Sequence, residues 1–221
     1  MSKVEELVSR AIERLAERRP LFHSEADFQL ALAWQLQQDE PSAELRLEKR
    51  VIDDPRVELD ILLVLDGHRH GLELKFPRSK LDVEVEGERF VLRTGAPDLD
   101  RYDVLRDVAR LERLVSAGII DEGCGVVLTN VPGLWQPPSR AVPASYDAFR
   151  IHEGREVTGT LDWGATAGEG TKTGREHPIV LGGNYHLTWR AYSDVFGAQV
   201  RCLLIPVEEA PDEPGPVDLL E

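Results

Sequence analysis

The chain has 221 residues, of which 42% are hydrophobic, and it carries a formal net charge of −14 at pH 7. This is the composition of an ordinary globular domain. No run approaches the ~18 apolar residues of a membrane span, and the polar N-terminus lacks the apolar core of a signal peptide. We therefore expect a cytoplasmic protein without membrane contact. Only Cys124 and Cys202 occur, too few and too isolated for a zinc site or a disulfide framework, so we expect both to be buried thiols.

The charge is unevenly distributed along the chain. We expect one domain over residues 1–207 and an acidic tail over residues 208–221, whose Pro-rich composition, with six acidic and no basic residues, is typical of disorder. The rest of the chain still has a formal charge of −8. Nucleic-acid binding depends largely on Lys and Arg that neutralise phosphates. Any such binding would therefore need a local basic patch or a basic protein partner, or would belong to an autoinhibited or selective enzyme.

Two helices and a strand are predicted first. Apolar residues recur at helical spacing from Val4 to Ala16, and a second helix is expected to start after Ser24 and to run through Leu36. This places Glu25 in the first helical turn, where an anion is favoured in any helix. Alternation over 44–52 then predicts a strand that leads toward the next element.

A β-hairpin over residues 57–76 is the most informative segment. Asp66-Gly67 between apolar alternating runs indicates a type I′ turn, which needs a positive φ at both central residues. In that register Asp60 lies opposite Glu73, and Lys75 shares their face because side chains two residues apart point the same way. The residues expected on the other face, toward a core, are Leu59, Ile61, Leu63, Leu65, Leu72, Leu74 and Phe76.

This grouping of two carboxylates and an ammonium indicates a metal-dependent phosphodiesterase site. Crowded like charges are costly unless they are compensated, and carboxylate oxygens suit Mg²⁺ or Mn²⁺, so Asp60 and Glu73 are the expected ligands. Lys75 would orient or deprotonate the attacking water, or stabilise charge on phosphorus. The alternative is an incidental salt bridge on a solvated sheet face.

The pattern resembles the PD-(D/E)XK nuclease superfamily, which has the restriction-endonuclease-like fold. In that superfamily an acidic helix residue precedes a strand aspartate and then Glu-x-Lys, positions matched here by Glu25, Asp60 and Glu73-Leu74-Lys75. The residue before Asp60 is leucine rather than the proline of the motif. Later segments around Tyr102-Asp103, 110–113, 128–130 and 134–135 are similar to an uncharacterised bacterial family within the superfamily. The resemblance implies that Glu25 assists the metal or the water.

Further elements complete the expected sheet. A hairpin over 81–93 is expected as an edge ribbon, a helix over 98–116 follows, and Cys124 to Thr129 reads as a buried strand. On the helix Arg106, Arg110 and Arg113 fall on the stripe opposite the apolar one, as phosphate contacts or as ordinary solvated charges. This order of elements favours a mixed β-sheet flanked by helices.

The remaining part of the chain is less regular. Short strands are expected at 149–151, 156–161, 185–189 and 200–207, around a flexible Gly-rich loop at 164–174 that lacks the P-loop pattern. Lys172 in this loop is a second candidate nucleic-acid contact, and an ordinary surface loop is the alternative.

The sequence thus predicts an α/β, restriction-endonuclease-like domain with extra C-terminal strands, acting as an Mg²⁺-dependent nuclease in defence or DNA processing. Its expected partner is nucleic acid, with DNA favoured over RNA, and a homodimer or a basic protein partner is a further expectation. The alternative function is a catalytically silent nuclease fold used for protein interaction or nucleic-acid sensing.

Overall fold

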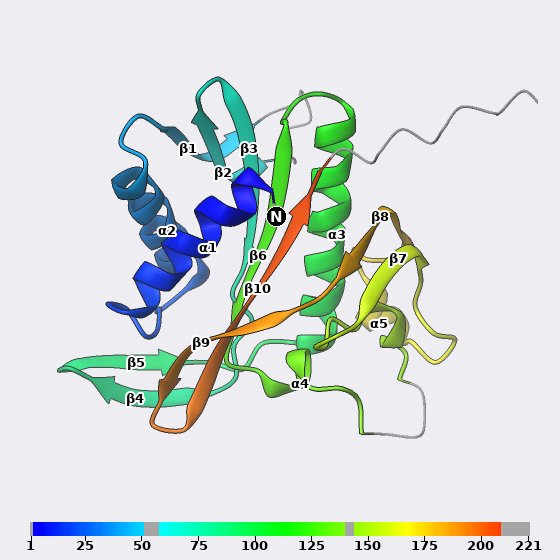
Figure 1. Cartoon of the computed structure of the whole chain (residues 1–221). Helices are drawn as coiled ribbons and strands as arrows, with labels where there is room; N and C mark the ends of the chain where they lie inside the picture. The colour runs from blue at the N-terminus through cyan, green and yellow to red at the C-terminus, as the bar shows by residue number, and fades with distance from the viewer. Residues whose placement is uncertain (1, 51–57, 140–143, 209–221) are drawn as a thin grey trace, which may run out of the picture.

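The computed structural model describes residues 2–50, 58–139 and 144–208, so the predicted tail lies, after Glu208, outside the described residues. The chain forms an α/β structure (Figure 1). The helices are α1 (Lys3–Ala16), α2 (Glu25–Asp39), α3 (Pro97–Ser116), α4 (Pro132–Trp135), the 3₁₀ helix η1 (Asp147–Phe149) and α5 (Glu169–Lys172). The strands are β1 (Glu44–Arg50), β2 (Glu58–Leu65), β3 (His68–Lys75), β4 (Leu81–Val85), β5 (Glu88–Leu92), β6 (Glu122–Thr129), β7 (Glu156–Leu161), β8 (Ile179–His186), β9 (Trp189–Val195) and β10 (Ala198–Val207).

Six of the described strands form one mixed sheet in the order β1-β2-β3-β6-β10-β9. Only β3 and β6 pair in parallel, joined through α3, and the other neighbours are antiparallel. The strands β4 and β5 form a separate ribbon, as expected, and β7 pairs with β8 in a second small sheet. The prediction of a mixed sheet with helices on its faces and added C-terminal strands is confirmed.

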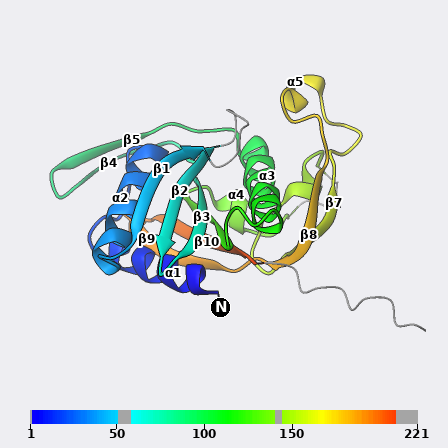
Figure 2. The ribbon, with the colours of Figure 1, turned by 90° about the horizontal axis from the view of Figure 1, so that it is seen from above.

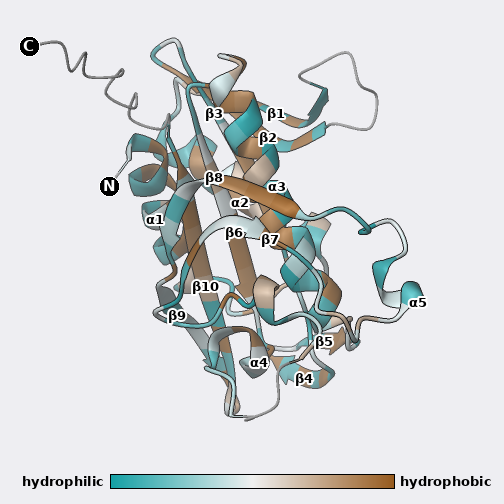
Figure 3. Cartoon of the chain, turned by 90° about the vertical axis from the view of Figure 1, so that its right-hand side faces the viewer, coloured by the Kyte–Doolittle hydropathy of each residue, from teal (hydrophilic) through white to brown (hydrophobic). Residues whose placement is uncertain are grey.

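The sheet separates two hydrophobic clusters. The helices α1 and α2 cover one face and α3 covers the other (Figure 2). On β6, Cys124, Val126 and Leu128 face the first cluster and Val127 the second, as the alternation of a strand requires. Figure 3 shows hydrophobic colour along β6 and β10 where they cross the middle of the molecule. Both cysteines are buried and free, as predicted.

The β2–β3 hairpin has the predicted turn. Asp66 and Gly67 have φ values of 53° and 80°, and the register pairs Ile61 with Leu72 and Leu65 with His68. One expectation is wrong: Leu59 packs in the α3 cluster, whereas Ile61 packs in the cluster under α1 and α2. The reason is local, because the β2–β3 pairs end at Ile61, and on β1 Glu48, which lies between the partners of Ile61 and Leu59, has a φ of 49°.

Three glycines let α3 approach the sheet closely. Gly71 and Gly123 are register partners on β3 and β6. A β-carbon on Gly71 would lie 2.8 Å from Ile120 Cδ1, and one on Gly123 would lie 3.1 Å from Leu111 Cβ. Gly125 continues this row under Val108, at 3.5 Å. Because no side chains fill this space, the polar flank of α3 reaches the polar residues of β3.

Two predicted elements in the C-terminal part differ from the structure. The expected strand at 149–151 has no strand conformation, and its first residue, Phe149, is the last residue of the 3₁₀ helix η1. The expected strand at 185–189 is divided between β8 and β9, which run much further in both directions. Here the alternation is broken by Gly182 and Gly183, so periodicity alone did not indicate β8.

The glycine row gives a testable prediction. Gly123→Val should destabilise the fold by about 1–3 kcal/mol, because the added methyl groups meet Leu111 across a packed interface. The control is Gly182→Ala, where a β-carbon meets nothing within 4 Å. Urea denaturation followed by circular dichroism measures both, and equal losses in the two variants would contradict the close approach of α3.

Candidate active site

The site forms where β2 and β3 stop pairing. Beyond the Ile61–Leu72 pair, two carboxylates take over as acceptors for the backbone of β3. Asp60 Oδ2 accepts a hydrogen bond from the Leu74 N–H at 2.6 Å, and Glu25 Oε2 accepts one from the Phe76 N–H at 2.7 Å. Each bond to a charged acceptor fixes its side chain against a rigid strand.

These hydrogen bonds bring α2 to the hairpin. Glu25 lies in the first turn of α2, where the Ser24 hydroxyl caps the helix by accepting from the Asp27 N–H at 3.1 Å. One turn later Gln29 donates to the Asp60 carbonyl oxygen at 2.7 Å. Asp60 Oδ1 and Glu25 Oε1 have no hydrogen bond to any residue that the structure describes. Among the described residues, each carboxylate is therefore held through one oxygen.

The remaining charges of the site form ion pairs with α3. Arg110 binds Glu73 through two hydrogen bonds, Nε to Oε1 at 2.9 Å and Nη2 to Oε2. Lys75 Nζ lies 2.7 Å from Asp107 Oδ2, and Arg110 Nη2 lies 3.1 Å from Asp107 Oδ1. Glu73 is 2% exposed and Asp107 is 3% exposed. The buried row Glu73–Arg110–Asp107–Lys75 thus links β3 to α3.

Burial and mutual repulsion shift the titration of these groups. Burial raises the pKa of Asp60 to about 6, although the Leu74 N–H and Lys75 oppose the shift. Burial and Asp107 also raise the pKa of Glu73 against the attraction of Arg110. Burial alone would lower the pKa of Lys75, but Asp107 and Glu25 outweigh it and raise the pKa. Lys75 is consequently an ammonium at neutral pH.

Among the residues that the structure describes, this cluster contains four carboxylates and two cations. The carboxylates are Glu25, Asp60, Glu73 and Asp107, and the cations are Lys75 and Arg110. If all are ionised, the cluster has an excess of two negative charges. Such an excess is costly at a buried site without a further cation.

No family model matches this chain, and no curated protein matches it either.

The carboxylate oxygens of the cluster are the kind of ligand that a hard divalent cation prefers. In the described ranges no three His, Cys, Asp or Glu side chains converge as a metal-holding group. Mg²⁺, however, is usually bound through one or two carboxylates together with waters and substrate phosphate. Asp60, which the described residues hold through Oδ2 and whose pKa is raised by burial, fits such a ligand. In the same described ranges, no helix is long and apolar enough to cross a membrane.

The arginine stripe differs from its expected arrangement. Arg113 is exposed and Arg106 is partly exposed, with its guanidinium 3.0 Å from Asp103. Arg110 does not join a solvent-facing stripe as expected, because it turns toward the sheet and binds Glu73. Residues three and four apart are neighbours on a helix, so Arg106 and Arg113 flank the cluster.

The residues that flank the loop carrying Lys172 are held by hydrogen bonds. Arg175 binds Asp103 of α3 through two hydrogen bonds, at 3.0 and 2.6 Å. Trp163 Nε1 donates to the Arg175 carbonyl oxygen at 2.8 Å, and the Tyr102 hydroxyl donates to that of His177 at 2.8 Å. These contacts hold the two ends of the 164–174 loop, and the flexibility expected between them stays a prediction; Lys172 is the last residue of α5 and is partly exposed.

Sequence reasoning missed two acidic residues. Asp107 lies three residues before Arg110, and this spacing on one helix face was the signal that could have found it. Asp100, two turns earlier, has its pKa raised to about 6, mainly by burial and then by Asp103 and Glu25. Nothing in the sequence indicated that Asp100 would lie near Glu25.

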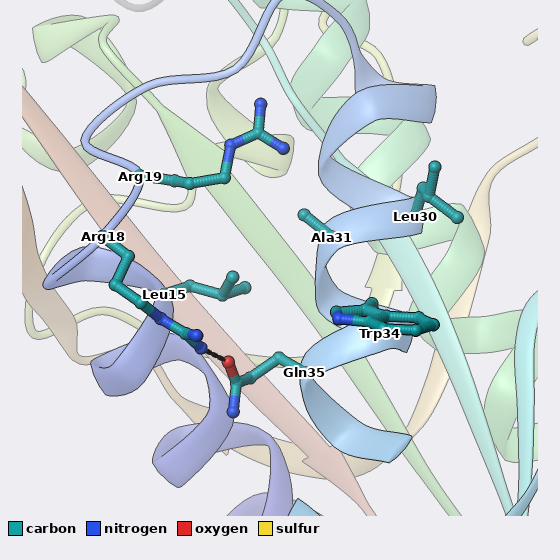
Figure 4. Close-up of a pocket in the computed structure, with 7 residues that line it drawn as sticks. All are labelled: Leu15, Arg18, Arg19, Leu30, Ala31, Trp34 and Gln35. Atoms are coloured by element: carbon teal, nitrogen blue, oxygen red, sulfur yellow. Dashed lines mark hydrogen bonds between the residues drawn. The ribbon is translucent and has the colours of Figure 1, made fainter. Parts of the chain in front are cut away.

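An apolar hollow lies elsewhere on the described part of the chain. It has a volume of about 450 Å³ and lies between the end of α1 and the outer side of α2, next to Leu30 and Trp34 (Figure 4). Those two side chains are 61% and 65% exposed. None of the predicted site residues lines it.

The raised pKa of Asp60 predicts a pH-dependent cost to stability. Below pH ~4 Asp60 is protonated in both folded and unfolded chains. Between pH ~4 and ~6 the unfolded chain ionises first, so stability falls as pH rises, by about 3 kcal/mol in total. Asp60→Asn keeps an acceptor for Leu74 but removes this titration, so its stability relative to wild type should rise over that pH range and then level off.

Urea denaturation at several pH values in EDTA measures this difference. The matched control is Asp66→Asn, which removes an exposed carboxylate from the hairpin turn. A pH-independent difference between wild type and Asp60→Asn would contradict the burial of an ionised Asp60.

Proposed function

We propose that the protein is a metal-dependent nuclease of the PD-(D/E)XK, restriction-endonuclease-like type, which hydrolyses phosphodiester bonds in nucleic acid. The observation that carries the proposal is the cluster in which Asp60 and Glu25 cap the freed N–H groups of β3, beside Glu73 and Lys75. When all four carboxylates are ionised, they exceed the two cations by two negative charges, which a divalent cation would balance.

The arrangement of the elements supports the assignment. The acidic residue lies in the first turn of α2, the aspartate on β2 and Glu-x-Lys on β3, in the order that the superfamily motif has. The strands β1, β2, β3 and β6 with α2 and α3 form the mixed core around them. The uncharacterised bacterial family that the later segments resemble is proposed as the nearer relative.

Asp60 and Glu73 would hold Mg²⁺ or Mn²⁺, with Glu25 assisting through Oε1, the oxygen that does not bind the Phe76 N–H. The bound cation would polarise a phosphoryl oxygen and lower the pKa of a bound water. The chain's own contribution is to position the carboxylates. The Leu74 N–H fixes Asp60 and the Phe76 N–H fixes Glu25, so these side chains need little reorganisation when charge develops.

Lys75 acts as a hydrogen-bond donor in this proposal. Its raised pKa keeps the proton on Nζ, which supports orientation of water and stabilisation of charge on phosphorus rather than proton abstraction. Asp107 fixes the direction of the ammonium from α3 at 2.7 Å.

Phosphates on either side of the cleaved bond would contact the flank of α3 and the loop that carries Lys172. Arg106, Arg113 and Lys172 are the proposed contacts, with DNA favoured over RNA. These local cations matter because the chain as a whole is acidic. A homodimer or a basic protein partner would extend this surface.

A catalytically silent protein of the same fold is the second candidate. One observation favours it: Glu73 and Lys75 are already paired with Arg110 and Asp107. Such a closed network would stabilise the fold without any metal, and the fold would then serve protein interaction or nucleic-acid sensing.

Cleavage assays separate the two candidates. Wild type with Mg²⁺ or Mn²⁺ should cleave at least one of single- or double-stranded DNA or RNA. Lys75→Met keeps the apolar stem and removes the ammonium, so it should lower the rate about 10²-fold or more, and Asp60→Asn should do the same. Lys3→Met, on the exposed side of α1, is the control. Equal inactivity of wild type and Lys75→Met on every substrate would replace the nuclease by the silent fold.

Salt dependence tests the proposed phosphate contacts. Replacing both Arg106 and Arg113 with Ala should reduce the log–log slope of binding against salt concentration by about one unit per lost contact. Arg10→Ala removes a cation of α1 that is paired with Glu40, and it should leave the slope unchanged. Fluorescence anisotropy at several salt concentrations measures it, and an unaltered slope in the double variant would assign both arginines to ordinary solvation.

A further inference from the structure

Arg110 occupies the position of a counter-ion inside the acidic cluster. Its guanidinium covers both oxygens of Glu73 and also lies 3.1 Å from Asp107. The Arg110 side chain is 20% exposed and that of Glu73 is 1% exposed, so water screens this pair poorly. Without Arg110, Glu73 would be a buried carboxylate next to Asp60 and Asp107.

We propose that Arg110 is the resident counter-ion of the cation site, which stabilises Glu73 when no divalent cation is bound and competes with that cation for it. This inference rests on the proposed function and deepens it, because it names what regulates cation entry. The bidentate geometry carries it: both Glu73 oxygens are engaged by one guanidinium, and a cation that takes Glu73 must displace at least one of these hydrogen bonds.

The structure provides a second partner for the displaced guanidinium. Arg110 Nη2 already contacts Asp107 Oδ1, and Arg110 and Asp107 are three residues apart on the same helix, where side chains are neighbours. A small rotation can therefore transfer Arg110 from Glu73 to Asp107 without exposing an unpaired charge. Lys75 remains bound to the other oxygen of Asp107 throughout.

Competition has a consequence that a purely structural salt bridge lacks. If Arg110 only supported the fold, its removal would disorder Glu73 and weaken cation binding. If it is the counter-ion, its removal frees a carboxylate and deletes a repelling charge, so cation binding becomes tighter. The direction of the change in affinity distinguishes the two.

The test is Mn²⁺ binding to the full chain by calorimetry, without nucleic acid, for wild type and Arg110→Gln. We expect the Kd of Arg110→Gln to be lower by about tenfold or more, and that of the control Arg46→Gln, an exposed arginine of β1 paired with Glu44, to stay within about twofold. In EDTA the thermal midpoint of Arg110→Gln should fall below that of wild type, and saturating Mn²⁺ should raise it by more than it raises wild type.

An unchanged or higher Kd in Arg110→Gln would overturn the inference. If this variant does not fold in EDTA, Arg110→Lys keeps the charge without the bidentate geometry and should bind Mn²⁺ more tightly than wild type, and an equal or weaker affinity would overturn it too. If wild type binds Mn²⁺ and Asp60→Asn does not, the proposed function stands whatever the result for the Arg110 variants. If wild type binds no Mn²⁺, the metal proposal and this inference both fail.

Discussion

The buried charges between β3 and α3 are the constraint on which the site depends. Glu73 and Asp107 are almost fully enclosed, and a buried carboxylate without a partner is strongly destabilising. They can be buried because α3 lies close to the sheet over Gly71 and Gly123, which brings Arg110 within hydrogen-bond reach of Glu73. Close helix packing and charge compensation therefore depend on each other, and both are local to this one face of the sheet.

The other half of the site depends on an interruption of regular structure. Where β2 leaves β3, the N–H groups of Leu74 and Phe76 lose strand partners and bind Asp60 and Glu25 instead. Backbone donors that are buried need acceptors, so the two carboxylates satisfy the strand as much as the strand positions them. The cost appears in Asp60, whose pKa is raised by burial to about 6, a cost in stability that is typical of functional sites.

The sequence predicted the parts of the site that depend on local geometry. The turn at Asp66-Gly67 follows from two positive φ angles, and from it the register that places Asp60 near Glu73. The start of α2 followed from the Ser24 cap. The sequence could not show which side chains of α3 contact the sheet. The helical angle placed Arg110 among the residues opposite the apolar stripe, but a long side chain at the edge of that stripe can turn toward the sheet. Leu59 was misplaced for a similar reason, since strict alternation does not anticipate that the β2–β3 pairing ends at Ile61.

The central claim is that these carboxylates share a divalent cation, and a crystal structure with Mn²⁺, read by anomalous scattering at the manganese edge, tests it most directly. The account predicts one strong anomalous peak between β2, β3 and the start of α2, with metal–oxygen distances of about 2.1 Å to Asp60 and Glu73, and Arg110 moved toward Asp107. A site without a peak at saturating Mn²⁺, with Arg110 still bound to both oxygens of Glu73, would contradict it.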